Sequence, residues 1–339
     1  MKKTLLSLAC IFSASLSNVA FAADEVNVYS ARKEALIKPL LDKFTEQSGI
    51  KVNLVTGKAD ALITRMVKEG EYSPADLLIT TDAGRLVRAK SSAISQPISD
   101  SVDLSKVNSD YVDGQRHWVG LTLRARPIMY SPERVSADQL STMEALTDDG
   151  WKGRICIRSS SNIYNQSMVA AMIEQLGSEQ TEVWANGMVE NFARPPKGGD
   201  RDQIKAVVAG QCDIAIANTY YLAGMRESDD EQTRNTANQV KVFWPNQDDR
   251  GAHVNISGVA VAKHAPNPAA AQKLVEYMLS DEAQQWYAQT NGEYPVIEGV
   301  EWSDTLKAMG TFKAESVPLN VVGEKNGEAL KLMDRAGWK

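Results

Sequence analysis

The sequence has 339 residues, of which 43% are hydrophobic and 24% charged, and its formal net charge is −6. This length is enough for two domains with a sizeable core, and the composition is that of a globular protein. The acidic balance argues against nucleic acid or an anionic membrane surface as a partner. No stretch beyond the N-terminal segment approaches the ~18 apolar residues of a membrane span.

The N-terminus has the pattern of a secretory signal peptide. Two lysines precede an apolar run over residues 5–19, and Ala20-Phe21-Ala22 has the A-x-A form of a cleavage site. We therefore expect residues 1–22 to be removed after Ala22 and the exported chain to act in the periplasm. Cys10 lies within the apolar run, but its surroundings are a poor lipoprotein signal, so we do not expect a membrane-tethered form.

Alternating strand and helix patterns predict an α/β fold. Strand patterns occur at residues 26–30, 51–55 and 75–80, and helical patterns at 34–47 and 60–69 lie between them. This β-α-β-α-β order predicts a parallel, wound sheet.

The second half of the chain continues the alternation. Helices are expected at residues 136–146, 165–176, 181–191, 200–208, 268–279, 281–289 and 327–335. Short strands are expected around Cys156 and Cys212 and at residues 240–245.

Two long extended segments, residues 118–130 and 255–262, suit crossings between two lobes. Two α/β lobes joined by two such crossings describe a hinge-bending solute receptor that closes over a ligand in its cleft. We expect one lobe to contain residues 23–122 and 254–298. The other lobe would contain residues 123–253 and 299–339.

Two matching stretches carry the candidate site. In each, an apolar strand with a cysteine runs into a polar loop and reaches a tyrosine at the same spacing, Tyr164 after Cys156 and Tyr220 after Cys212. If the two strands are neighbours, both loops leave the same edge of one sheet, and ligands of open α/β sheets bind at that carboxyl edge. Tyr164, Tyr220 and the adjacent Tyr221 would then converge on one point.

Three converging phenols suggest a hard metal ion. A lone tyrosine has a pKa near ~10 and stays neutral at pH 7. A highly charged cation favours oxygen ligands and displaces the phenolic proton, and ferric iron is the hard trivalent cation most relevant to a cell. Tyrosines at strand ends also simply cap a core with the hydroxyl at the surface. Residue types alone leave both interpretations open.

The exported chain would keep two cysteines, Cys156 and Cys212. An even count in an oxidising compartment favours a disulfide between them, and their matching positions on two candidate neighbour strands strengthen this prediction. Such a bond would fix the two tyrosine loops relative to each other. The alternative is a pair of buried free thiols.

The sequence also resembles a known family, the periplasmic ferric-ion-binding proteins of ABC iron importers. The residues that carry the resemblance are Val28-Tyr29-Ser30-Ala31-Arg32, Ser73-Pro74-Ala75-Asp76, Leu123-Arg124-Ala125-Arg126, Arg158-Ser159 with Tyr164, Lys197-Gly198-Gly199-Asp200-Arg201-Asp202-Gln203, Asn218-Thr219-Tyr220-Tyr221, Phe243-Trp244-Pro245-Asn246-Gln247 and Asn255-Ile256-Ser257-Gly258. The resemblance spans nearly all of the exported chain. Its most specific mark is the tyrosine pair after Asn-Thr.

The resemblance implies a two-lobe periplasmic-binding-protein (type II) fold and one Fe3+ in the cleft. It implies Tyr164, Tyr220 and Tyr221 as the metal ligands. It further implies a monomeric carrier, not an enzyme, that docks on an inner-membrane ABC permease.

This sequence departs from some branches of the family. Those branches add a His or a His-Tyr pair after the first strand, where this chain has Arg32, Lys33 and Glu34. Others add a Glu after the third strand, where residues 80–82 are Thr-Thr-Asp. Three phenolates fill only half of the octahedral positions that Fe3+ prefers, so water or a small anion must supply the rest.

Arg32 and Arg124 are placed by strand-end logic and by resemblance to face the cleft. A guanidinium group binds a planar oxyanion through two hydrogen bonds, so we hypothesise that bound carbonate or bicarbonate completes the metal shell. Alternatively, each arginine is a solvated or salt-bridged surface residue.

Other functions remain to be weighed. A receptor for an organic anion or a chelated metal would use Arg32 and Arg124 as anchors and bind without free iron. An enzyme using a tyrosine as acid or nucleophile lacks a plausible general base nearby in sequence. Tyr29 either faces the cleft or packs against its lobe, and Asp82 is either an acceptor behind the metal ligands or a turn residue.

Overall fold

The computed structural model describes residues 24–339. The predicted signal peptide and its cleavage after Ala22 lie outside these residues. None of the helices between residues 24 and 339 is both long enough and apolar enough to cross a membrane.

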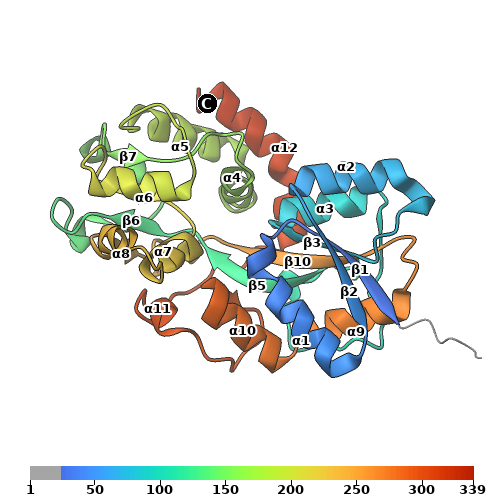
Figure 1. Ribbon diagram of the computed structural model, residues 1–339. Coiled ribbons are helices and arrows are strands. Elements are labelled where there is room, and N and C mark those ends of the chain that lie inside the picture. The colour runs from blue at the N-terminus through green and yellow to red at the C-terminus, as the bar shows by residue number, and fades with distance from the viewer. Residues whose placement is uncertain (1–23) are drawn as a thin grey trace, which may run out of the picture.

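Two sheets form the centres of two lobes, as Figure 1 shows. Within the described residues, the first sheet has seven strands in the order β11-β5-β10-β3-β1-β2, with β4 paired to β10. Its strands are β1 Glu25–Ser30, β2 Lys51–Thr56, β3 Leu77–Thr81, β4 Ser95–Gln96, β5 Val119–Ala125, β10 Val254–Ala262 and β11 Tyr294–Pro295. β1 runs parallel to β2 and β3, as predicted, whereas β10 runs antiparallel to β3 and β5.

The second sheet has the order β7-β8-β6-β9. Its strands are β6 Ile128–Tyr130, β7 Ile155–Cys156, β8 Ile214–Ile216 and β9 Lys241–Phe243. β7 and β8 are parallel neighbours, with Cys156 opposite Ala215. The predicted adjacency of the two cysteine strands is therefore confirmed.

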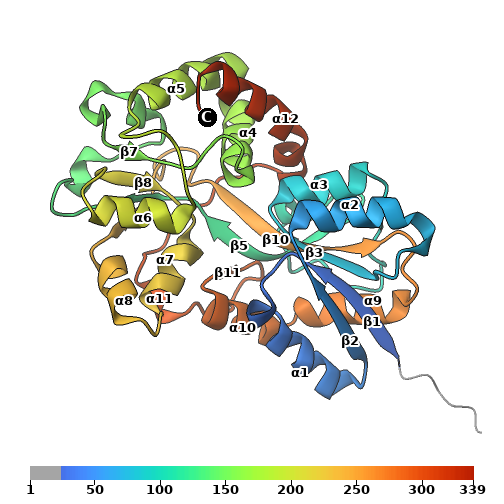
Figure 2. The same cartoon turned by 45° about the horizontal axis from the view of Figure 1, so that its top comes forward.

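Helices cover both sheets (Figure 2). The α-helices are α1 Lys38–Ser48, α2 Ala59–Glu69, α3 Ala83–Ser91, α4 Ile163–Leu176, α5 Ser178–Glu190, α6 Asp200–Val208, α7 Thr219–Arg226, α8 Glu231–Asn238, α9 Pro268–Met278, α10 Asp281–Asn291, α11 Asp304–Lys307 and α12 Leu319–Arg335. Short 3-10 turns occupy Glu34–Leu36, Gly70–Tyr72, Ser109–Tyr111, Ala137–Gln139, Glu144–Thr147 and Asp149–Trp151. α12 packs on α4 of the second lobe and on α3 of the first.

Local sequence explains these boundaries. In α2 the residues Leu62, Ile63 and Met66 recur at helical spacing and are buried, so one face of the helix joins the core. α1 has a proline in its first turn and ends at Gly49, whose φ of 72° is the left-handed conformation that glycine adopts at a helix end.

The chain passes between the lobes twice. β5 of the first sheet ends at Ala125 and β6 of the second begins at Ile128, so the predicted 118–130 segment is two strands that meet at Arg126-Pro127. The return crossing leads into β10, and the backbone amide of Arg126 donates to the carbonyl of His253 over 3.0 Å. The predicted two-lobe α/β fold with two crossings is confirmed. The exact division into lobes by residue number stays a prediction.

Two helix predictions were wrong in part. Residues 136–146 form 3-10 turns instead of one helix, because buried residues three apart, Leu140, Met143 and Leu146, suit a 3-10 turn as well as an α-helix. α12 begins at Leu319, ahead of the predicted start at 327. Gly323 lies inside α12, where a Cβ atom would stand 2.4 Å from a methyl carbon of Val87, so this glycine allows close packing on α3.

Candidate functional site

The three predicted tyrosines lie on the first turns of two helices. Tyr164 follows the N-cap Asn162 of α4, and Tyr220 and Tyr221 follow the N-cap Asn218 of α7. The sequence predicted a polar loop for these residues, so this placement corrects it. The N-terminus of a helix carries a partial positive charge, which favours negative groups such as phenolates.

The structure brings the three phenols together. The hydroxyl of Tyr220 donates to the hydroxyl oxygen of Tyr164 over 3.2 Å, although the two residues come from different helices. The rings of Tyr220 and Tyr221 lie with centroids 4.2 Å apart at an angle of 33°.

A cavity of about 250 Å³ adjoins the tyrosines and is lined from both lobes. Its lining residues are Ala31, Arg32, Lys33, Leu36, Thr81, Arg124, Tyr164, Arg201, Tyr220, Tyr221, Gly224, Glu227, Thr290, Asn291 and Glu293. All five of the predicted metal-binding and anion-binding residues are in this set.

A guanidinium group lies near the ring of each tyrosine. The distances from guanidinium carbon to ring centroid are 4.9 Å for Arg124 and Tyr220, 5.5 Å for Arg158 and Tyr164, and 5.9 Å for Arg201 and Tyr221. These cations lie within the range of cation–π attraction and would offset phenolate charge.

The phenols hold their protons firmly. Burial, reinforced by Tyr164, raises the pKa of Tyr220 well above its usual value of 10 despite the opposing effect of Arg124. Burial also raises the pKa of Tyr221 to about 12. Both phenols are therefore neutral at pH 7, and a cation that binds their oxygens must displace protons.

Arg32 and Arg124 share one buried carboxylate that the sequence did not reveal. Arg32 Nη2 donates to Glu293 Oε2 over 2.7 Å, and Arg124 Nη2 donates to Glu293 Oε1 over 2.8 Å. The hydroxyl of Ser257 accepts from Nη1 of Arg32 over 2.8 Å and from Nη2 of Arg124. Thr122 also donates to Glu293. The two arginines are thus salt-bridged, but they are buried and not the surface residues of the alternative prediction, and they line the cavity.

Charge pairing keeps Glu293 ionised. Burial alone would raise the pKa of Glu293, but Arg32 and Arg124 outweigh it and lower that pKa below its usual range. Conversely, burial opposes the charge on Arg124, while the attraction of Glu293 prevails and raises the pKa of the guanidinium.

Some N–H groups of these arginines remain available. Among residues 24–339, no acceptor lies within hydrogen-bond distance of the buried Nε and Nη1 of Arg124 or of Nε of Arg32. A buried donor without a partner is costly, so these groups are suited to an anionic ligand.

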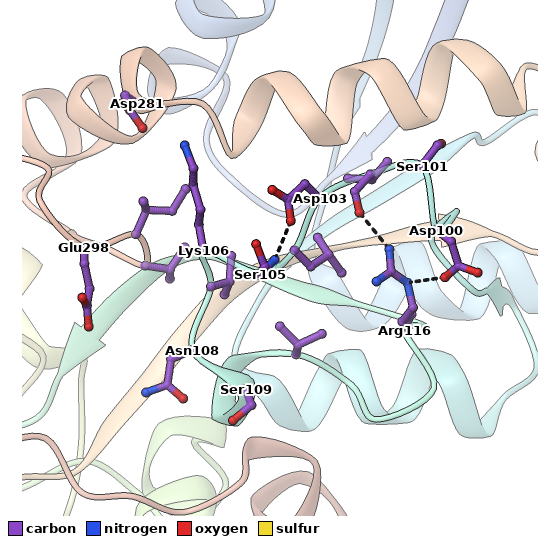
Figure 3. Close-up of a pocket in the computed structure, with 16 residues that line it drawn as sticks. Asp100, Ser101, Asp103, Ser105, Lys106, Asn108, Ser109, Arg116, Asp281 and Glu298 are labelled. Atoms are coloured by element: carbon purple, nitrogen blue, oxygen red, sulfur yellow. Dashed lines mark hydrogen bonds and ion pairs between the residues drawn. The ribbon is translucent and has the colours of Figure 1, made fainter.

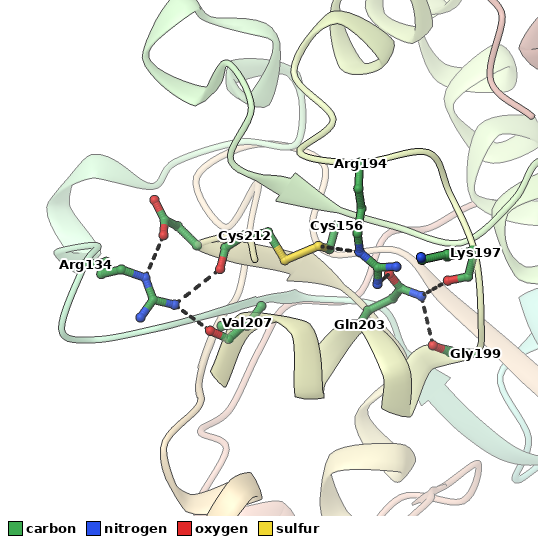
Figure 4. Close-up of a disulfide and its surroundings, with 9 residues drawn as sticks. Arg134, Cys156, Arg194, Lys197, Gly199, Gln203, Val207 and Cys212 are labelled. Atoms are coloured by element: carbon green, nitrogen blue, oxygen red, sulfur yellow. Dashed lines mark hydrogen bonds and ion pairs between the residues drawn. A yellow bond between two sulfur atoms is a disulfide. The ribbon is translucent and has the colours of Figure 1, made fainter. Parts of the chain in front are cut away.

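The predicted disulfide between Cys156 and Cys212 is confirmed (Figure 4). It joins Cys156 of β7 to Cys212, two residues before the start of β8, and β7 and β8 are the parallel strands that lead toward the tyrosines. Nε of Arg194 lies 3.4 Å from the sulfur of Cys156, and Arg194 Nη2 donates to Gln203 of α6. The disulfide therefore links the two chain segments that lead to Tyr164 and to Tyr220, at a place next to α6.

Tyr29 and Asp82 do not line the cavity. Tyr29 is buried in a cluster with residues of α2 and its hydroxyl donates to Glu69 over 3.1 Å, so it packs against its own lobe. Asp82 caps α3 and accepts a hydrogen bond from Ser167 of α4 over 2.7 Å, which links the two lobes.

The largest cavity described lies elsewhere. It has a volume of about 1190 Å³, is an open groove along residues 100–109 of the first lobe, and contains none of the predicted site residues (Figure 3). In the described part of the chain, no group of three or more His, Cys, Asp or Glu residues could hold a metal ion. Phenolic oxygens are therefore the protein donors to consider.

Two α/β lobes, two crossings between them and a cavity lined from both sides define a solute-binding receptor. The chain belongs to the bacterial extracellular solute-binding protein family, which it matches over residues 40–314. Members of this family bind solutes for transport, so the chain is a binding protein and not an enzyme.

Similar proteins have names that concern iron. The chain is 46% identical to iron uptake protein A1 of Synechocystis over 93% of this chain and 88% of that protein. A Trichodesmium protein (IdiA, FutA), solved in complex with iron and citrate ligands, is 49% identical and matches with a TM-score of 0.90 over 93% of this chain and 100% of that one. An apo ferric ion-binding protein A from Pasteurella haemolytica is 42% identical, with a TM-score of 0.86 over 93% and 98% of the two chains. The resemblance described from the sequence is thereby confirmed.

Proposed function

We propose that this chain is a periplasmic receptor that binds Fe3+ through the phenolate oxygens of Tyr164, Tyr220 and Tyr221. The observation that carries the proposal is the 3.2 Å contact between the hydroxyls of Tyr164 and Tyr220, beside Tyr221 and at a cavity lined from both lobes. Three phenolic oxygens from two helices gathered at one cavity form a donor set that a single hard cation could use together.

The charges around the site suit a trivalent cation. Three phenolates would carry three negative charges, which match Fe3+ and would be further stabilised by the N-termini of α4 and α7. Because burial raises the pKa values of Tyr220 and Tyr221, these two phenols would lose their protons only as a cation binds their oxygens. Because a divalent ion attracts phenolates less strongly, we expect reduction to Fe2+ to favour release.

An anion would complete the metal shell. The free Nε and Nη1 groups of Arg124 point to an oxyanion, which we expect to be carbonate, bicarbonate or a hydroxycarboxylate. The citrate in the similar Trichodesmium structure supports the hydroxycarboxylate, and our earlier hypothesis from the sequence named carbonate.

The partner would be an inner-membrane ABC permease, because solute-binding proteins of this family supply such transporters. In the same proposal the carrier is a monomer in the periplasm, exported with a signal peptide cleaved after Ala22. Neither nucleic acid nor insertion into a membrane forms part of it.

The experiment is a titration of the purified exported chain with ferric citrate, followed by visible absorption. Deprotonated phenolates on Fe3+ should give a charge-transfer band near ~450–500 nm. Tyr220→Phe should weaken or shift this band. Tyr72→Phe is the matched control, since Tyr72 is 85% exposed and does not line the cavity. A wild-type protein that stays colourless would contradict phenolate ligation.

A second candidate follows from the same free arginine donors. A receptor for an organic anion or a chelated metal would hold its carboxylates on Arg32 and Arg124 and use the tyrosines only as packing. Calorimetry with citrate alone separates the two, because this candidate predicts binding without iron.

A further inference from the structure

Arg126 is a buried cation that the iron site, as proposed, does not use. It lies between β5 and β6, at the first crossing of the chain from one lobe to the other, and its side chain is 1% exposed. It does not line the cavity. A charge this deep is costly unless its hydrogen bonds are satisfied, so its partners reveal what it holds in place.

One partner holds the helix that carries the tyrosine pair. Arg126 Nη1 donates to the side-chain oxygen of Asn218 over 3.1 Å. Asn218 is the N-cap of α7, two residues before Tyr220. The amide of Ala125, next to Arg126, also donates to the hydroxyl of Thr219 over 3.5 Å. The crossing segment therefore contacts both residues that precede the tyrosine pair.

A second partner holds the helix that carries the third tyrosine. Arg126 Nη2 donates to the side-chain oxygen of Asn165 over 2.6 Å, and Asn165 directly follows Tyr164 in the first turn of α4. The amide nitrogen of Asn165 in turn donates to the carbonyls of Arg158 and Ser159 in the preceding loop. One guanidinium group thus spans the starts of α4 and α7.

The counterion of Arg126 strengthens the same link. Asp200, the first residue of α6, is fully buried and accepts from Arg126 Nη1 over 3.2 Å. It also accepts from the backbone amide of Asn218 over 2.9 Å and from Arg158, whose guanidinium lies near the ring of Tyr164. Asp200 therefore fixes α7 directly and the Tyr164 side of the site through Arg158.

We propose that Arg126 is the positioning residue of the metal site: its guanidinium, held by Asp200, sets the separation between Tyr164 on α4 and the Tyr220–Tyr221 pair on α7. The phenols are then assembled before the ligand arrives, which lowers the ordering cost of binding. Because Arg126 lies at the crossing between the lobes, its hydrogen bonds also fix the three tyrosines relative to this crossing. The iron-binding readout of this proposal rests on the proposed function.

Arg134 provides a matched control in the same lobe (Figure 4). Its Nε donates to Asp213 over 2.7 Å, and its Nη2 donates to the carbonyls of Val207 and Cys212 over 2.5 and 3.2 Å. Like Arg126 it joins one carboxylate and two further acceptors, but at the amino end of β8 and away from the tyrosines.

The experiment compares Arg126→Lys, Asn165→Ala and Arg134→Lys in the exported chain. Lysine keeps the charge opposite Asp200 but cannot span Asn165 and Asn218 as a planar fork does. Each variant is titrated with ferric citrate, and competition with a chelator gives the affinity. We expect Arg126→Lys to bind iron about tenfold more weakly, the effect of one lost charge-assisted hydrogen bond, and to shift the charge-transfer band.

Asn165→Ala should move the band in the same direction, because it removes the Arg126 contact at the start of α4 together with the hydrogen bonds to the carbonyls of Arg158 and Ser159. Arg134→Lys should leave band and affinity as in wild type. Unchanged band and affinity in both Arg126→Lys and Asn165→Ala would overturn the proposal. If Arg126→Lys does not fold, Asn165→Ala decides alone.

A second readout is independent of iron. In crystals of the iron-free Asn165→Ala protein, we expect the 3.2 Å separation of the Tyr164 and Tyr220 hydroxyls to increase. A wider separation in a chain whose wild type gives no iron band would contradict the proposed function and leave the positioning role standing. An unchanged separation would overturn the positioning role even if wild type binds iron.

Discussion

Arg124 and Arg126 lie two residues apart at the end of one strand and serve opposite lobes. Arg124 pairs with Glu293 of the first lobe, and Arg126 pairs with Asp200 of the second. Both guanidinium groups are buried, and each shares its carboxylate with another arginine, Arg32 or Arg158.

The difference between them lies in the donors left over. Arg124 keeps Nε and Nη1 without a hydrogen-bond partner among the described residues and borders the cavity. Arg126 keeps only Nε without a partner, and both of its terminal nitrogens are occupied by protein groups away from the cavity. A buried arginine that has unpaired N–H groups beside a cavity is suited to binding a ligand. A buried arginine whose terminal nitrogens bind residues at the starts of helices is suited to fixing the positions of those helices. The following predictions test this contrast.

Lowering the pH should have the largest effect on iron affinity, and this prediction tests the tyrosines at the cavity. The phenols bind protons tightly, with the pKa of Tyr221 raised to about 12 by burial, so every phenolate formed on Fe3+ releases a proton. Iron affinity should therefore rise with pH and fall as pH drops, by up to about tenfold per pH unit for each proton released. Competition titrations at about pH 6, 7 and 8, corrected for protonation of the chelator, measure the slope. A flat profile would mean that the phenols are not ligands.

Glu293→Gln should come next, because it removes the buried carboxylate that Arg32 and Arg124 share. Leaving buried charges unpaired costs about 3–5 kcal/mol of unfolding free energy. The folded pKa of Glu293 is lowered, so the wild-type contribution is present above the unfolded pKa and is lost as pH falls through the folded pKa. Urea unfolding at pH 7 and pH 4 should show a large difference between the two proteins at pH 7 and a smaller one at pH 4.

Arg124→Ala should reduce iron affinity by about 10- to 100-fold when an oxyanion is present, the usual range for groups that support metal ligands. The loss should shrink when citrate and bicarbonate are removed and the iron is supplied from an inert chelator. If the variant binds equally well under both conditions, the spare donors of Arg124 do not hold an anion.

Lys38→Ala should have the smallest effect on the stability of the fold, and it provides an exposed ion pair for comparison with the buried ones. Lys38 and Asp42 form an ion pair at spacing i, i+4 on α1, with side chains that are 50% and 55% exposed. Such pairs contribute about 0.3–0.5 kcal/mol, so thermal unfolding should barely change. If Lys38→Ala lowered the free energy of unfolding as much as Glu293→Gln, burial would not explain why the two ion pairs differ in their contribution to stability.

The sequence predicted the tyrosines but not the carboxylates that pair with the neighbouring buried arginines. Tyr164, Tyr220 and Tyr221 could be predicted because both cysteine strands carry the same pattern and end at one sheet edge. Asp200 was noted only at a predicted helix start and within the family resemblance, and Glu293 was not noted at all. Each acquires its charge partner from far along the chain: Arg126 lies 74 residues from Asp200, and Arg124 lies 169 residues from Glu293. Charge pairing in the core depends on tertiary contacts that no local spacing encodes.

The same limit explains the secondary-structure errors. α7 was missed because Tyr220 and Tyr221 interrupt the helical pattern, although Asn218 stands at the N-cap position, where its side-chain oxygen accepts from Arg126 and not from the helix backbone. The start of α12 was placed too late because Gly323 lowers helix propensity, which packing against α3 overrides.

The docking of α12 on α4 has a consequence for when the metal site can exist during biosynthesis. α4 begins with a site tyrosine, yet a main packing partner of that helix is made more than a hundred residues later, and the indole of Trp338 donates to the carbonyl of Arg158 beside the site. A nascent chain that has completed Tyr164, Tyr220 and Tyr221 still lacks this support. Under the proposed function, metal capture should therefore await synthesis of the chain through α12.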